Sequence, residues 1–87
     1  MTDRVSKSDL IQRIARRTSQ DAVLVEEIVD ATFAEITEAL KEGFPVTVRD
    51  FGTFYVRVER DQWVFKFNPS QRLRALFGWS STYRGER

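Results

Sequence analysis

Hydrophobic positions near the start of the chain recur at the spacing of an α-helix. Ser6 and Asp9 form an S-x-x-D start signal, in which the hydroxyl accepts from a first-turn N–H and the carboxylate lies at the positive end of the helix. The apolar residues that follow share one helical stripe, Leu10, Ile11, Ile14 and Ala15. We therefore predict a first helix of about three turns, ending near Arg16 and Arg17.

A second, longer helix is predicted from about residue 20 to residue 41. Thr18-Ser19 interrupts the first pattern and offers an N-cap, with Asp21 in the first turn, while Gly43 and Pro45 stop the helix at its other end. The helix has a wide apolar face, formed by Val25, Ile28, Val29, Thr32, Phe33, Ile36 and Leu40. A face this wide is expected to contact a second subunit or a third element of the same chain.

From Val46 the hydrophobic period changes to two, which predicts β-structure. A half-buried strand is expected to continue from there to residue 59, with a bend or bulge at Gly52. The polar residues 60–62 separate it from a second alternating run, 63–67, so the two should form a short antiparallel hairpin. Pro69 is placed in the first turn of a third, short helix that Gly78 ends.

Length and composition limit how such a chain becomes stable. Its 87 residues predict one domain, 1–78, followed by a tail, 79–87, and a domain of this size buries only roughly 60% of its unfolded surface. The sequence has no Cys and no His for disulfides or a structural zinc, so we expect oligomerisation to add stability. No long apolar run or signal-peptide pattern is present, which predicts a soluble cytoplasmic protein.

Charge and residue chemistry narrow the function. The formal net charge is +1, but residues 1–48 carry six basic and nine acidic groups, whereas residues 49–87 carry eight basic and four acidic groups. The predicted strands thus lie in the basic half. Without His, Cys or a Gly-rich phosphate loop the sequence offers no catalytic apparatus, so we expect no enzyme, no cofactor, no metal and no small-molecule substrate.

Three motifs, in this order, carry a resemblance to a known family. The first is Ser6-Lys7-Ser8-Asp9-Leu10-Ile11. The second is the helix end 36–43 followed by Phe51-Gly52-Thr53-Phe54, and the third is Phe67-Asn68-Pro69-Ser70 with Leu73-Arg74. Over residues 6–77 the chain resembles the HU/IHF family of bacterial histone-like, nucleoid-associated proteins.

The resemblance implies an α+β, IHF-like fold and an intertwined homodimer. Two N-terminal helices and a short C-terminal helix would form a base, capped by a short antiparallel sheet that makes a saddle. Core and dimer contacts would come from the aromatic residues Phe33, Phe51, Phe54, Phe65 and Phe67. The family's long basic β-ribbon arms have no counterpart between Phe54 and Phe67, and Asp50 replaces the glycine that usually precedes the F-G-x-F motif.

The expected function is weak, largely nonspecific binding of duplex DNA in the nucleoid, through phosphates and with little bending. Arg57 and Lys66 are the best phosphate-contact candidates, followed by Lys7, Arg74, Tyr55 and Arg72, whereas Glu59 on the same face opposes phosphate. Two alternatives stay open. The cations could simply solvate an exposed hairpin, and the fold could be a dimeric protein-interaction module that has lost DNA binding with the arms.

Overall fold

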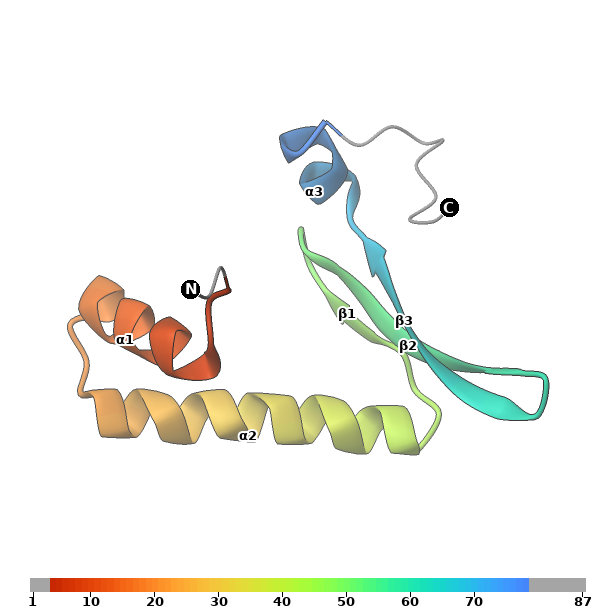
Figure 1. The fold of residues 1–87 in the computed structure, drawn as a ribbon, viewed down its shortest axis with the longest axis horizontal. Helices are drawn as coiled ribbons and strands as arrows, with labels where there is room; N and C mark the ends of the chain where they lie inside the picture. Colours follow the sequence, from red (N-terminus) through yellow and green to blue (C-terminus); the bar gives the residue numbers. More distant parts are fainter. Residues whose placement is uncertain (1–3, 79–87) are drawn as a thin grey trace. The chain divides into compact units, whose positions relative to one another are not determined.

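The computed structural model describes residues 4–78, which form three helices and three strands (Figure 1). The described residues divide into two compact parts, residues 4–36 and residues 37–78. The predicted tail, 79–87, lies outside the described residues. Among the described residues, no helix is long and apolar enough to cross a membrane.

Helix α1 (Lys7–Thr18) begins where the sequence predicts. The Ser6 hydroxyl accepts from the Asp9 backbone N–H at 3.1 Å, and the Asp9 carboxylate accepts from the Ser6 N–H at 3.0 Å. This reciprocal pair satisfies two amide donors that a helix start leaves without partners. Because the bond from the Ser6 backbone N–H favours the charged carboxylate, the pKa of Asp9 is lowered.

Helix α2 (Ala22–Lys41) starts later than predicted, and the predicted cap at Thr18-Ser19 is wrong. Thr18 is the last residue of α1, and Ser19 ends that helix in the left-handed conformation, with φ of 57°. The carbonyl of Asp21 instead accepts the first bond of α2, from the Val25 N–H at 3.0 Å. The polar pair Thr18-Ser19 therefore ends α1 and does not cap the start of α2.

Little of the apolar face of α2 is buried within the first part of the chain. Ile11 of α1 and Val25 of α2 are 5% and 4% exposed, and they form the small core between the helices. Farther along α2, Ile28 and Phe33 keep 56% and 53% of their surface exposed.

Three antiparallel strands, β1 (Val46–Val48), β2 (Gly52–Glu59) and β3 (Gln62–Pro69), form a sheet in that order (Figure 1). The prediction of one bent strand from Val46 to residue 59 is wrong, because residues 49–51 make a tight turn. The Phe51 N–H donates to the Val48 carbonyl at 2.9 Å, and Asp50 adopts a positive φ of 65°. The chain therefore reverses before Gly52 rather than bending at it.

The β2–β3 hairpin confirms the expected short connection, which consists of Arg60 and Asp61 alone. Both have positive φ, 53° and 66°, as a two-residue type I′ turn requires. The register pairs Glu59 with Gln62 and continues to Gly52 with Pro69. Because paired residues of an antiparallel ladder point the same way, the sheet has two faces.

The apolar face of the sheet carries the side chains of Val46, Phe54, Val56, Val58, Trp63, Phe65 and Phe67. Its aromatic rings contact one another: the ring centroids of Phe54 and Phe67 are 4.9 Å apart, and those of Phe51 and Phe67 are 5.4 Å apart. These separations are those of favourable aromatic pairs. The aromatic cluster thus holds the turn before β2 against β3.

Helix α3 (Gln71–Leu76) is shorter than predicted, and Pro69 is not part of it. Pro69 is the last residue of β3, where it pairs with Gly52. Ser70 is the N-cap, and its hydroxyl accepts from the Leu73 N–H at 3.1 Å. Three helices and an antiparallel sheet confirm the predicted α+β class.

Candidate nucleic-acid interface

The polar face of the sheet brings together three of the residues predicted to contact DNA. Tyr55 pairs with Lys66, and Arg57 pairs with Val64 in the next row of the ladder. Glu59 and Gln62 form the last row before the turn. Arg57, Lys66 and Tyr55 therefore lie on one surface, opposite the aromatic cluster.

A carboxylate joins the two cations of this face. The Arg57 Nε–H donates to Oε2 of Glu59 at 2.6 Å, and Nζ of Lys66 lies 3.5 Å from the same oxygen. The bond to Glu59 raises the pKa of Arg57, and the bond from Arg57, with the nearby Lys66 charge, lowers the pKa of Glu59. Arg57 and Glu59 are therefore both charged at neutral pH.

Arg74, a residue of α3, contacts the end of the polar face that lies farthest from the β2–β3 turn. Its guanidinium donates to the Asn68 side-chain oxygen at 2.7 Å and to the Pro69 carbonyl at 3.1 Å. Asn68 pairs with Thr53 and shares the face of Lys66, so it extends the polar surface toward the helix. Asn68 was not predicted as a residue of the DNA-binding face. Its position two residues after Lys66 on the same strand could have placed it there.

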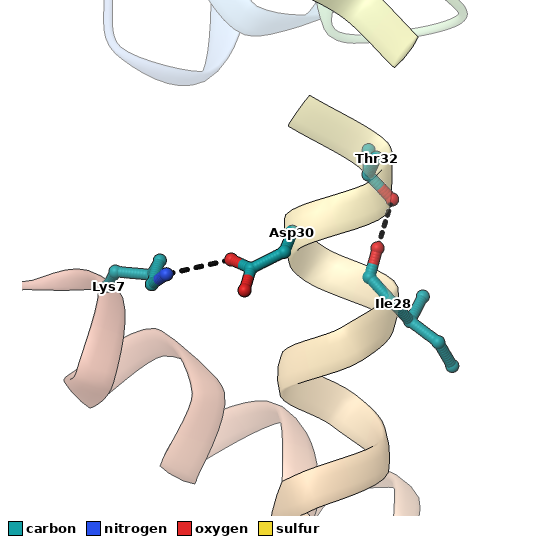
Figure 2. A network of polar contacts seen from close by, with 4 residues as sticks. All are labelled: Lys7, Ile28, Asp30 and Thr32. Atoms are coloured by element: carbon teal, nitrogen blue, oxygen red, sulfur yellow. Dashed lines mark hydrogen bonds and ion pairs between the residues drawn. The ribbon is translucent and has the colours of Figure 1, made fainter. Parts of the chain in front are cut away.

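Arg72 and Lys7, the remaining predicted contacts, belong to the helices α3 and α1. Arg72 is exposed on α3. Lys7 belongs to the first part of the chain, where its Nζ lies 2.7 Å from the Asp30 carboxylate, as Figure 2 shows. This hydrogen-bonded pair raises the pKa of Lys7. Within the first part of the chain, Lys7 is therefore paired with a carboxylate of α2.

The aromatic residues predicted for the core and the dimer divide in the same way. Phe51, Phe54, Phe65 and Phe67 form the cluster on the sheet, whereas Phe33 lies on α2 in the first part. Beside the cluster is an apolar hollow of about 440 Å³, bounded by Thr37, Leu40, Lys41, Val56, Trp63 and Phe65. Trp63 is 70% exposed and Phe65 is 60% exposed, so this face is largely uncovered in a single chain.

The site has the chemistry of anion binding. Within residues 4–78 no three His, Cys, Asp or Glu side chains gather where they could hold a metal ion. The polar face instead offers guanidinium and ammonium donors, a phenol and an amide. Such groups bind phosphate oxygens, and Arg does so with two parallel bonds where its fork is accessible.

Comparison with known proteins adds sequence evidence. The family model described as "Bacterial DNA-binding protein" matches residues 5–70. DNA-binding protein HU-beta of Neisseria meningitidis serogroup A is 43% identical over 58 residues, which cover 64% of this chain and 65% of that protein. DNA-binding protein HU of Thermus thermophilus is 33% identical over 70 residues, covering 80% and 72%. The chain thus spans just under two-thirds of the Neisseria relative.

Solved structures show the same fold. An HU mutant from Thermotoga maritima superposes with a TM-score of 0.77 at 33% identity, covering 83% of this chain and 97% of that one. A cocrystal structure of Anabaena HU with DNA gives a TM-score of 0.73, covering 83% and 96%; at 19% identity it is evidence for the fold alone.

Proposed function

Because the chain belongs to the HU family of bacterial DNA-binding proteins, as its motifs predicted, we propose that it binds duplex DNA as a homodimer, through phosphates and with little sequence preference. The observation that carries the proposal is the placement of Arg57 and Lys66 on one polar face, opposite a largely uncovered apolar face. One surface would then meet the duplex and the other a second subunit. The family is named for DNA binding, and we assign no catalytic activity to the chain.

Binding through phosphates should be weak and sensitive to salt. Arg57, Lys66, Lys7 and Arg74 all have acceptors within the chain, so DNA has to compete for them. If each subunit places two or three cations on phosphates, a dimer makes about 4–6 contacts, and log K should fall with log salt at a slope of about −4 to −5.

Strong bending of the duplex is not expected. The β2–β3 hairpin ends at a two-residue turn, so the described chain has no long ribbon to follow a groove. Bending a site costs of order 1–6 kcal/mol, which architectural proteins offset with extra contacts and apolar wedges. A surface limited to the hairpin and α3 offers few such contacts.

We infer the homodimer from the small number of apolar side chains that one chain buries by itself. Among residues 4–78 only Ile11, Val25 and Leu40 are buried apolar side chains, while fifteen large hydrophobic residues are exposed. An uncovered apolar surface of this extent is typical of subunit interfaces. We place the dimer in the cytoplasm, in the nucleoid, since that is where a duplex-binding protein of this family would meet DNA.

A second candidate function follows from the contacts that the predicted DNA-binding cations already make with acceptors of the same chain. If Glu59, Asp30 and Asn68 hold their cations permanently, the fold would serve as a dimeric protein-interaction module without DNA binding. The exposed apolar face would then supply a partner surface.

The proposal is tested by fluorescence anisotropy of a labelled random-sequence duplex titrated with protein. The titration is run at about 50 and about 200 mM salt, the range over which the loss of phosphate contacts changes the affinity strongly. We compare the wild type with the double variant Arg57→Gln and Lys66→Gln. The matched control is Arg17→Gln with Lys41→Gln, which removes the same charge from the C-terminal turns of α1 and α2.

Salt-sensitive binding that the polar-face double variant loses and the control keeps would support the DNA-binding function. No binding by the wild type at low salt would overturn it and favour the interaction module. Equal losses in both double variants would show that net charge alone attracts the duplex.

A further inference from the structure

We propose that Glu59 is a built-in competitor of the DNA phosphates, which sets the affinity of the polar face by occupying Arg57 and Lys66. The inference rests on the proposed function and deepens it, because it identifies a residue that limits binding at the same site. It follows from three side chains of the β2–β3 hairpin and their two contacts.

The register of the hairpin creates this cluster. Arg57 and Glu59 are two residues apart on one strand, so their side chains leave the same face about 6.7 Å apart. Lys66 lies opposite Tyr55, one row behind Arg57, and its long side chain reaches diagonally past Val64 to the carboxylate. Both cations therefore lean toward the turn and converge on one oxygen, at 2.6 Å and 3.5 Å.

A carboxylate oxygen and a phosphate oxygen are alternative acceptors for the same donors. The 2.6 Å bond uses the Nε–H of Arg57, one of the two donors of a side-on bidentate contact to phosphate. A phosphate that takes this donor has to displace Glu59, whose negative charge then remains beside the duplex. The cluster contributes a net charge of +1 instead of the +2 of its cations.

The exposure of the cluster argues against a mainly structural role for Glu59. The Arg57 side chain is 58% exposed, and the side chains of Glu59 and Lys66 are 36% and 34% exposed. Ion pairs this open to solvent contribute little to stability, since water and salt screen them. Replacing the carboxylate by its isosteric amide should therefore leave the fold intact while removing the negative charge that holds both cations.

The test compares Glu59→Gln with Glu38→Gln in the anisotropy titration. Glu38 is an exposed carboxylate that lies 3.4 Å from Lys41 on α2, so the control removes the same charge from the same kind of pair. Thermal unfolding followed by circular dichroism checks that both variants fold like the wild type.

Glu59→Gln is expected to bind more tightly than the wild type and to steepen the salt dependence. One added cationic charge per subunit changes the slope of log K against log salt by about −1.8 per dimer, so the gain should be roughly tenfold larger at 50 than at 200 mM salt. Glu38→Gln should change the slope by less than half as much.

Equal effects of the two variants on a DNA-binding wild type would overturn the role of Glu59 and leave the proposed function standing. Binding by Glu59→Gln alone, with a wild type that does not bind at low salt, would overturn the proposed function of the wild-type chain and support Glu59 as the residue that prevents phosphate contact. If wild type, Glu59→Gln and Glu38→Gln all fail to bind at low salt, the proposed function fails and this inference fails with it.

Discussion

Gly52 and Asn68 approach each other so closely that a Cβ atom on Gly52 would lie 2.5 Å from the carbonyl oxygen of Asn68. The same atom would lie 2.7 and 2.8 Å from two ring carbons of Phe67. Backbone on one side and the aromatic cluster on the other leave no space for a side chain. The glycine of the F-G-x-F motif therefore lets β2 and β3 pair beside a packed ring.

Gly52→Ala should consequently lower the free energy of unfolding by roughly 2–4 kcal/mol, since the backbone of β3 has to move and the φ of +157° at Gly52 adds backbone strain. Urea denaturation followed by circular dichroism measures the change. Gly43→Ala is the matched control: φ is +88° there, but nothing lies within 4 Å of the added Cβ, so it should cost only about 1–2 kcal/mol of backbone strain. Equal losses at the two positions would contradict the close-approach explanation.

The β2–β3 turn offers a stability prediction of the opposite sign. Asp61 adopts φ of 66°, a conformation in which glycine carries no steric penalty. Asp61→Gly should raise stability by roughly 0.5–1 kcal/mol, a gain partly offset by the freer unfolded chain. Asp61→Ala should lower stability, because alanine lacks the polar side chain that makes the left-handed region tolerable for Asp. Thermal unfolding of both variants tests this order, and a stabilising alanine would refute it.

Local chemistry made the main elements of this fold predictable. The Ser6–Asp9 cap and the alternation of Phe54, Val56 and Val58 depend on neighbouring residues, so the sequence predicts α1 and the sheet faces correctly. The turn at Asp50 was harder to predict. Its left-handed residue is not a glycine, and the adjacent Gly52, which looks like the bend, is needed for the contact with Asn68.

The contacts of the cations depend on register, which the sequence left open. Residues 60–62 look like a polar connection, but Gln62 belongs to β3 and only Arg60 and Asp61 form the turn. A three-residue turn would have set Arg57 opposite Phe65, because a slip of one residue moves a strand's side chains to the other face. The shared contact of Arg57 and Lys66 with Glu59 therefore required the structure.

The helix cap predicts a pH dependence of stability. Bonds from Ser6 hold the pKa of Asp9 below its ordinary value of 3.8, so the charged carboxylate stabilises the folded state. That contribution is fully present above the unfolded pKa and is lost as pH falls through the lower, folded pKa. Wild type should therefore exceed Asp9→Asn in urea stability at pH 7, and the difference should shrink below about pH 4. A stability difference that stays constant down to about pH 2.5, which is about one unit below the unfolded pKa, would contradict a role for the charge of Asp9.

The apolar face of the sheet predicts a dependence of stability on protein concentration. Phe65 is 60% exposed in one chain and lines the apolar hollow. If a second subunit covers this face, unfolding includes dissociation, and the midpoint temperature of the wild type should rise with concentration. Sedimentation equilibrium of the wild type should give the mass of two chains.

Phe65→Ser should weaken that dimer, because the ring is buried mainly when two chains associate. Losing the burial of one ring in each subunit corresponds to roughly 1–3 kcal/mol per site, or at least a tenfold higher dissociation constant. Val64→Ser is the control: Val64 is the next residue on β3 but points to the polar face with Arg57, so its loss should leave the dimer mass unchanged. Dissociation caused equally by both variants would place the interface elsewhere, and an intact Phe65→Ser dimer would show that the apolar face is not the subunit contact.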